Sequence, residues 1–284
     1  MFDIVLWWTN MACNFSCDYC WQEQNQQHGK LMPVKYRSSK EWIQAWGKID
    51  AKVVDITGGE PFLMPDFENI AQFISRKSRI AITTNLSKPL DKFIDIVNPS
   101  DVVVITCSYH PLEYAKGSSR MSDDLFLGRC LLLKNRGYNV NVNFVAYRDL
   151  LHLAPEYKDR FNSRGISFHV DPYVPTEHVD FRYTDNEIKF LETLLTPNRY
   201  RAMMEGIGGR IGEVLCSAGT NYVMVWQDGT VWRCLRDMEM KINCLGNCLD
   251  GTFSPLSERL SCSVSHVCAG CDRDKIVVEI ANAG

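Results

Sequence analysis

Six apolar, β-branched runs alternate with segments of helical period between residues 3 and 195 of this 284-residue chain. Near-continuous hydrophobicity of this kind is typical of parallel strands that helices cover on one or both faces. Right-handed crossovers between successive strands then produce a curved α/β sheet, either open or partly closed as a barrel. In such sheets ligands bind at the C-terminal ends of the strands. The expected strands are residues 4–9, 53–57, 80–84, 102–106, 140–145 and 166–170.

Start signals for helices lie between these runs. Ser38 with Glu41 and Thr184 with Glu187 form two capping boxes, each followed by apolar residues at helical spacing. Asp66 is expected to cap a further helix with its side chain. These signals place helices after the first, second and sixth expected strands, as a βα repeat requires.

The sequence becomes rich in glycine and cysteine after residue 198, and we expect a domain boundary near residues 196–212. Residues 222–226 and 230–233 flank the Asp228-Gly229 turn and predict a β-hairpin. The fold class expected is therefore α/β. A partial (β/α)6 TIM-like barrel covers residues 1–195, and a small cysteine-rich β-hairpin/α domain covers residues 196–284.

Composition argues against nucleic-acid and membrane partners, and it leaves the role of twelve cysteines to be explained. With 31 Lys and Arg against 34 Asp and Glu, the net charge of −3 argues against a broad nucleic-acid or anionic-membrane surface. The N-terminus has no export signal, and no apolar run is long enough to span a bilayer. We expect a cytoplasmic protein, where the twelve cysteines more often hold metal than form disulfides.

Three of these cysteines, Cys13, Cys17 and Cys20, have C-x3-C-x2-C spacing directly after the first expected strand. Three thiolates on one short loop can bind three corners of a cubane iron-sulfur cluster and leave the fourth iron open for chemistry. The alternative is a zinc knuckle, for which His28 is the only nearby fourth ligand.

A Gly58-Gly59-Glu60-Pro61 turn follows the second expected strand at the same edge. Two glycines let the backbone approach a ligand, and Glu60 supplies a carboxylate for a cationic or amine group. Taken alone, this tetrapeptide could also be a simple βα turn.

Together the cysteine loop and the Gly-Gly-Glu-Pro turn resemble the radical S-adenosylmethionine (radical SAM) superfamily, over roughly residues 2–195. The resemblance implies a [4Fe-4S] cluster on the three cysteines, with S-adenosylmethionine chelating the open iron. It also implies reductive cleavage to a 5′-deoxyadenosyl radical that abstracts a substrate hydrogen atom, with an electron donor such as flavodoxin or ferredoxin. Tyr19 would pack near the adenine and residues 58–61 would hold the methionine amine. Three residues at strand ends, which could equally be ordinary turn or strand-end residues, would touch the ribose or carboxylate of the cosubstrate: Asn85, Ser108 and Asn143.

Seven more cysteines lie in the C-terminal region. Cys216 and Cys234, with Gly229 between them, resemble the opening of the SPASM and twitch auxiliary-cluster domains that follow many radical SAM barrels. Cys268 and Cys271 would complete the four ligands of one auxiliary [4Fe-4S] cluster. The later spacing departs from the full SPASM pattern, so one cluster is favoured over two and a structural zinc ribbon is the alternative. Three thiols stay undecided between ligand, hydrogen donor and structural roles: Cys244, Cys248 and Cys262.

Polar side chains after the sixth expected strand complete the predicted site. His169 and Asp171 are two residues apart, so both point to one face of a strand, where they could relay protons or bind hydroxyls. Auxiliary-cluster chemistry then suggests dehydrogenation, with His169 or Asp171 as base, or epimerisation, with Cys248 among the hydrogen donors. A small molecule or sugar is the favoured substrate, because the N-terminal segment leaves no room for a peptide-recognition domain. The alternatives are a peptide-modifying maturase and a non-catalytic metal-binding or redox-sensing protein.

Overall fold

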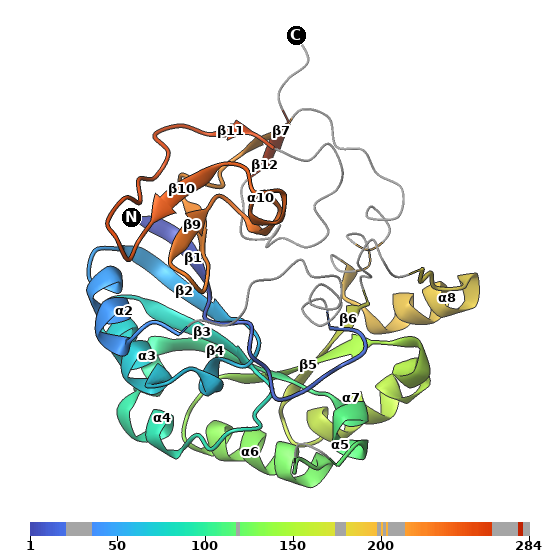
Figure 1. Cartoon of the computed structure of the whole chain (residues 1–284). Coiled ribbons are helices and arrows are strands. Elements are labelled where there is room, and N and C mark those ends of the chain that lie inside the picture. Colours follow the sequence, from blue (N-terminus) through green and yellow to red (C-terminus); the bar gives the residue numbers. More distant parts are fainter. Residues whose placement is uncertain are drawn as a thin grey trace.

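The computed structural model describes residues 1–20, 36–117, 120–173, 180–197, 200, 203, 214–262 and 278–280. A nine-stranded sheet organises this part of the chain, with the strand order β10-β9-β8-β1-β2-β3-β4-β5-β6 (Figure 1). Neighbouring strands from β8 through β1 to β6 pair in parallel, and the β8–β9 and β9–β10 pairs are antiparallel. The strands are β1 (Phe2–Trp8), β2 (Ala51–Thr57), β3 (Arg79–Thr84), β4 (Val102–Ser108), β5 (Val140–Ala146), β6 (Ser167–Pro172), β8 (Tyr222–Val225), β9 (Thr230–Trp232) and β10 (Cys244–Asn247).

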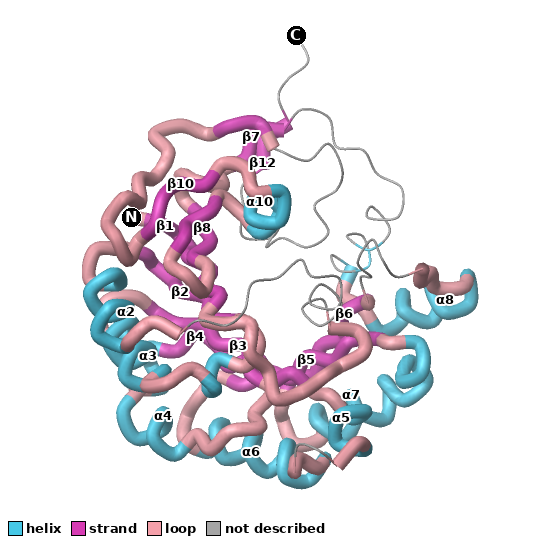
Figure 2. Tube along the Cα trace, in the orientation of Figure 1, coloured by secondary structure: helices cyan, strands magenta, loops and turns pink. Residues whose placement is uncertain are grey.

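Helices cover the convex face of the curved sheet, as Figure 2 shows. They are α2 (Ser39–Trp46), α3 (Phe67–Ser75), α4 (Asp91–Ile96), α5 (Pro111–Ala115), α6 (Asp123–Asn135) and α7 (Ala154–Asn162), and α8 (Asp185–Leu194) follows the last parallel strand. Short 3-10 turns occupy Pro61–Leu63, Pro99–Asp101 and Arg148–Leu153. This arrangement confirms the predicted α/β class and the partial barrel of six parallel strands.

Side chains of β1 alternate between two hydrophobic clusters, one on each face of the sheet. Val5 and Trp7 face the helices, and Trp7 packs on Trp42 and Trp46 of α2 with ring centroids 5.0 and 5.3 Å apart. Leu6 faces the opposite side and joins a smaller cluster with residues of β8. The central strand is therefore buried on both faces, which explains its unbroken hydrophobicity.

Both predicted capping boxes are present, at the N-termini of α2 and α8. The prediction for Asp66 is wrong in its mechanism. Asp66 precedes α3 in a left-handed conformation (φ 57°) and makes no side-chain capping bond. Its carboxylate accepts a hydrogen bond from Ser39 instead, at 3.1 Å, and so ties the start of α3 to α2.

The predicted hairpin is confirmed as β8 and β9. The sequence did not predict how this hairpin attaches to the barrel sheet. β8 pairs in parallel with β1, in the register Ile4↔Tyr222 to Trp7↔Val225, so one sheet continues across the expected domain boundary. A separate three-stranded sheet has the order β11-β7-β12, from Leu260–Ser261, Val214–Cys216 and Val278–Ile280. A short helix, α10 (Leu235–Met240), follows the hairpin.

None of the helices in the described parts of the chain combines the length and the apolar character that a membrane span requires.

Candidate active site

Loops that follow β1, β2 and β3 meet at the C-terminal edge of the sheet and hold one another through backbone bonds. Gly59 N donates to Asn10 O and Glu60 N donates to Ala12 O, both at 2.8 Å. A Cβ atom on Gly59 would lie 1.9 Å from Ala12 O, and Gly58 has a φ of 148°. Only glycine at both positions lets the Gly-Gly-Glu-Pro turn lie this close to the start of the cysteine loop.

Glu60 is fully buried, and its carboxylate is occupied by the chain itself. Oε1 accepts hydrogen bonds from Phe62 N (3.1 Å) and Thr84 Oγ1 (2.8 Å), and Oε2 accepts one from Asn85 N (2.7 Å). Burial outweighs these bonds and raises the pKa of Glu60 to about 7. In this structure the side chain joins the loops after β2 and β3, which is a different task from the amine recognition expected from the sequence.

Asn85 extends this connection to the cysteine loop. Its side-chain Nδ2 lies 3.6 Å from Cys13 Sγ and 3.4 Å from Asn14 Oδ1. Its own Oδ1 accepts a bond from Ser87 N at 2.9 Å. Asn85 therefore lies beside a predicted cluster ligand, at the end of β3 where the sequence placed it.

The cysteine loop carries its three thiols at different depths. Cys13 is exposed, Cys17 is buried and Cys20 is half-buried. Phe15 N donates to Cys13 Sγ at 3.4 Å. Loss of hydration at the sulfur raises the pKa of Cys13 to about 12 although the residue as a whole is exposed, and burial together with Glu113 raises the pKa of Cys17. These thiols hold their protons without a metal, so ligation must release protons.

His110, from the end of β4, contacts this loop directly. Its Nδ1 lies 2.8 Å from the Tyr19 hydroxyl and 3.5 Å from Cys17 Sγ. The Tyr19 ring stacks on His110 and is tilted against Tyr147, with centroids 5.9 and 5.4 Å away. Burial lowers the pKa of His110 to about 4, so this imidazole is neutral near pH 7.

Glu113 and Lys116 clamp the peptide of Ser16, which lies between the first two cysteines. Glu113 Oε2 accepts from Ser16 N at 3.1 Å, and Lys116 Nζ donates to Ser16 O at 2.9 Å. The two side chains also pair with each other at 2.6 Å, and only 1% of the Glu113 side chain is exposed. Glu113 therefore braces the cysteine loop from α5.

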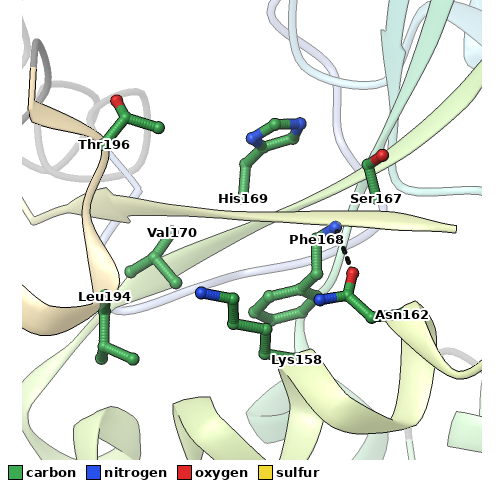
Figure 3. A pocket seen from close by; sticks show the side chains of 8 residues that line it. All are labelled: Lys158, Asn162, Ser167, Phe168, His169, Val170, Leu194 and Thr196. Atoms are coloured by element: carbon green, nitrogen blue, oxygen red, sulfur yellow. Dashed lines mark hydrogen bonds between the residues drawn. The ribbon is translucent and has the colours of Figure 1, made fainter.

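A row of polar residues crosses the concave face of the sheet at the ends of three strands. Ser108 of β4 pairs in register with Asn143 of β5, which pairs with His169 of β6. Asn143 Oδ1 is buried and has no hydrogen-bond partner. Figure 3 shows His169 on the opposite side of β6 from Val170, and Asp171 follows two residues later. The strand alternation thus confirms the predicted common face of His169 and Asp171.

One cavity, of about 290 Å³, lies at the free edge of β6. Of the predicted site residues it includes only His169, and its other walls come from α7, from the end of α8 and from both sides of β6 (Figure 3). It lies beside the polar row and does not include the cysteine loop. Its lining residues are Lys158, Asn162, Ser167, Phe168, His169, Val170, Leu194 and Thr196.

The C-terminal cysteines separate into two groups. Cys216, Cys234 and Cys262 belong to the small cluster on the side of β1 away from α2. Cys248 belongs to the large cluster that includes α2, and burial raises its pKa to about 12. Cys268 and Cys271, like His28, lie outside the described residues. The predicted role of Cys248 as a hydrogen donor stays a prediction, and its burial on the helix-covered side does not favour that role.

Sequence reasoning missed three residues that shape these loops. Lys116 closes the clamp on Ser16, Gln227 accepts a bond from Met11 N at 3.0 Å, and Arg233 is buried among the C-terminal cysteines. Lys116 could have been found from its i+3 spacing to Glu113. Gln227 carries no local signal, because Met11 lies far away in the sequence, and the only local signal at Arg233 is its i+4 spacing to Asp237.

Comparisons with known proteins agree with this arrangement. Residues 10–114 match the family model of the Radical SAM superfamily. A GTP 3′,8-cyclase of Aquifex aeolicus is 29% identical over 163 residues, which cover 52% of this chain and 50% of that protein. A probable GTP 3′,8-cyclase of Methanococcus maripaludis is 25% identical over 213 residues, 69% of this chain and 71% of that protein. The first of these matches spans only half the length of its relative.

Solved structures share the fold. SuiB of Streptococcus suis, bound to S-adenosylmethionine, superposes with a TM-score of 0.65 at 15% identity, covering 87% of this chain and 63% of that one. The native anSMEcpe enzyme with AdoMet and the Cp18Cys peptide gives a TM-score of 0.62 at 14% identity, covering 88% and 78%.

The fold and the site together define a partial α/β barrel whose cysteine loop, Gly-Gly-Glu-Pro turn and Asn85 meet at the strand ends. Residues 10–114 are therefore identified as radical SAM sequence by the family model, and the fold is the one that the solved structures share.

The residues of this loop fit the [4Fe-4S] cluster and S-adenosylmethionine that the domain implies. Three thiols follow one strand, and Phe15 N and Asn85 Nδ2 both approach Cys13 Sγ. The buried Asn143 Oδ1 has no hydrogen-bond partner and could accept one from the cosubstrate. Throughout the described residues, no three His, Cys, Asp or Glu side chains are gathered around a common metal position. The fit therefore rests on the donor chemistry and on the placement of the loop.

Proposed function

We propose that this chain is a radical SAM enzyme that binds a [4Fe-4S] cluster through Cys13, Cys17 and Cys20. The bound cluster and S-adenosylmethionine supply reductive cleavage of the sulfonium to a 5′-deoxyadenosyl radical, which removes a hydrogen atom from the substrate. A low-potential donor such as flavodoxin or ferredoxin would supply the electron. The observation that carries the proposal is the joining of the cysteine loop to the ends of β2 and β3 through Gly59, Glu60 and Asn85.

The chain's own residues divide the binding work. Gly58 and Gly59 let the turn after β2 lie against Asn10 and Ala12, so the backbone of this turn, beside the cysteine loop, would hold the methionine amine of the cosubstrate. Tyr19 and the neutral His110 offer stacked aromatic faces for the adenine. Ser108 and Asn143, paired across β4 and β5, present hydroxyl and amide groups to the ribose or carboxylate.

A small molecule is the substrate class that we propose. The curated relatives carry the name GTP 3′,8-cyclase, which is a small-molecule reaction. His169 and Asp171 face the same side of β6 and would act as base or hydroxyl ligand. An auxiliary cluster in residues 196–284 would accept the electron in a dehydrogenation. A peptide substrate is the second candidate, because the SuiB fold neighbour was also solved bound to its precursor peptide SuiA.

Anaerobic reconstitution followed by a cleavage assay tests the proposal. We expect dithionite-dependent formation of 5′-deoxyadenosine, which Cys17→Ala abolishes because one of three thiolate ligands is lost. Cys244→Ala, an exposed thiol on β10, is the matched control and should keep full cleavage. Zinc in place of iron, with no cleavage, would support the non-catalytic metal-binding alternative and overturn the proposal.

Deuterium transfer tests the substrate class separately. Uniformly deuterated GTP should deliver deuterium to 5′-deoxyadenosine if a purine nucleotide is the substrate. Cleavage without transfer from GTP, but with transfer from a deuterated peptide, would favour the second candidate and leave the radical chemistry intact.

A further inference from the structure

The cavity of about 290 Å³ at the free edge of β6, here called the edge cavity, contributes only His169 to the proposed function. β6 is the last strand in the order of the nine-stranded sheet, and no strand of the described chain pairs with its outer edge. Pockets for small molecules measure roughly 300–1,000 Å³, so this cavity is at the lower end of that range. Its size therefore suits a small molecule or one part of a larger one.

The backbone of β6 presents unpaired groups along this edge. Phe168 N donates to Asn162 Oδ1 at 3.2 Å and not to a neighbouring strand, so the backbone groups of Phe168 face outward. Backbone groups alternate in direction along a strand, so those of Val170, two residues further on, face the same edge. The N–H of Val170 is thus a donor at the edge of the strand where both residues line the cavity.

Lys158 gives the edge cavity its charge. The lining residues include this one lysine and no aspartate or glutamate. Lys158 is half-buried on α7, and within the described chain its ammonium has neither an ion pair nor a hydrogen-bond partner. Figure 3 shows its side chain extended below β6, with the nitrogen toward Val170 and Leu194. A partly desolvated cation without a partner favours an anionic ligand.

Two neutral side chains add further donors. Asn162 Oδ1 is occupied by Phe168 N, which leaves the Nδ2 group of the same amide, and Figure 3 shows that group on the side toward Lys158. Ser167 carries its hydroxyl on the opposite side of the strand, at the rim of the cavity. Carboxylate and phosphate oxygens accept several hydrogen bonds each, so such groups match a lining of this kind.

Apolar side chains form the rest of the lower wall. Phe168 and Val170 are buried, and Leu194 at the end of α8 is half-buried. A ligand with a small apolar or ring-shaped body would cover these side chains while its anionic group meets Lys158. A neutral ligand would leave the ammonium without a partner, and a cationic ligand would be repelled by it.

We propose that the edge cavity binds the carboxylate or phosphate of an anionic small molecule, with Lys158 as the charge partner and Asn162 and Ser167 as hydrogen-bond donors. His169 lines this cavity and also pairs in register with Asn143 of the polar row. A molecule bound at the edge therefore reaches the proposed substrate space. The cavity would then anchor the anionic end of the substrate, a step that rests on the proposed function.

Binding of simple anions to the full chain tests the proposal. Benzoate and phenyl phosphate are the probes, and benzyl alcohol is their neutral counterpart. In isothermal titration calorimetry we expect at least one anion to bind about tenfold or more tightly than the alcohol. The tighter of the two anions distinguishes a carboxylate site from a phosphate site. Equal affinity for the alcohol, or no binding of either anion at about 10 mM, would overturn the proposal.

Paired variants test the roles of individual residues. Lys158→Met keeps most of the side-chain length but removes the charge, and it should weaken anion binding at least about tenfold. Lys189→Met, at an exposed lysine of α8 outside the cavity, should leave the affinity within about twofold. Ser167→Asp should also abolish binding, by charge repulsion at an exposed position, whereas Ser167→Asn should retain it. Unchanged binding in both Lys158→Met and Ser167→Asp would overturn the assignment.

Location and folding are checked separately. Methyl resonances of Val170 and Leu194 should shift when the tighter anion is added, and shifts confined to other methyl groups would contradict binding at the edge of β6. Circular dichroism should give the same spectrum for Lys158→Met and the wild type, so a lost affinity is not unfolding. None of these measurements needs reductive cleavage of S-adenosylmethionine. Cleavage without anion binding would overturn this proposal alone, and anion binding without cleavage would overturn the proposed function alone.

Discussion

Glu60 was predicted from a motif to bind an amine group, and in the structure its carboxylate binds donors of the chain itself. The Glu60 carboxylate follows β2, as the sequence predicts. In the folded chain it is buried and accepts hydrogen bonds from Phe62 N, Thr84 Oγ1 and Asn85 N. Two of these come from a different βα unit, so no local pattern announces them. The motif therefore locates Glu60 at the end of a strand, but it does not predict which donors bind its carboxylate.

Removing this carboxylate should cost stability as well as activity. Glu60→Ala leaves buried donors without an acceptor, and we expect a loss of about 3 kcal/mol in the free energy of unfolding. Chemical denaturation of the wild type and the variant measures it. Glu156→Ala, exposed on α7, should change the same quantity by less than about 0.5 kcal/mol. Equal effects of the two substitutions would contradict the joining role of Glu60.

His110 should give the protein a measurable pH dependence. Its pKa is lowered from 6.5 to about 4 by burial, so the unfolded chain binds a proton more readily than the folded one. The corresponding stability is present above pH 6.5 and is lost as the pH falls toward 4, by about 3 kcal/mol in total.

Unfolding free energies measured between pH 4 and 7 test this. His110→Gln should remove that part of the pH dependence, because glutamine does not titrate. The exposed His152→Gln variant should keep it. A wild-type profile that is flat over this range, or one unchanged by His110→Gln, would show that the imidazole is not held neutral.

At the scale of elements, α5 acts as a brace for the cysteine loop. The helix is only five residues long, yet Glu113 lies within it and Lys116 caps its end, and both bind Ser16. These contacts join the segment after β4 to the loop after β1, across nearly 100 residues of sequence, so no local pattern predicts them.

Loss of this brace should increase local opening of the loop. Glu113→Ala removes the acceptor of Ser16 N and the carboxylate nearest to Lys116. We expect amide hydrogen exchange at residues 14–18 to quicken at least about tenfold, the equivalent of 1.4 kcal/mol. Glu192→Ala, exposed on α8, is the control. Unaltered exchange in the Glu113 variant would contradict the clamp.

Capping boxes and strands were predictable because each is encoded within a few residues. Ser38 with Glu41 and the hydrophobic run of β1 needed no distant partner. The pairing of β1 with β8 joins residues more than 200 positions apart, and Arg233 binds segments on both sides of itself. Such contacts depend on the folded topology, which explains why sequence patterns did not reveal them.

For the whole molecule, the continuous sheet predicts coupled unfolding of the barrel strands and the C-terminal hairpin. Val223 of β8 is fully buried beside β1. Val223→Ala should lower the free energy of unfolding by about 2 kcal/mol. Far-ultraviolet circular dichroism and tryptophan fluorescence should report one shared transition in both proteins. Two transitions, with the variant shifting only one, would instead support independent domains divided near residue 196.

The central claim is that the loop of Cys13, Cys17 and Cys20 binds a cluster with an iron open to S-adenosylmethionine. Electron paramagnetic resonance of the reduced Cys216→Ala/Cys234→Ala protein, which lacks two of the proposed auxiliary ligands, is designed to examine the first cluster alone. We predict a [4Fe-4S]⁺ signal whose g values change when S-adenosylmethionine is added. A signal that ignores S-adenosylmethionine, or that survives Cys17→Ala unchanged, would contradict the claim.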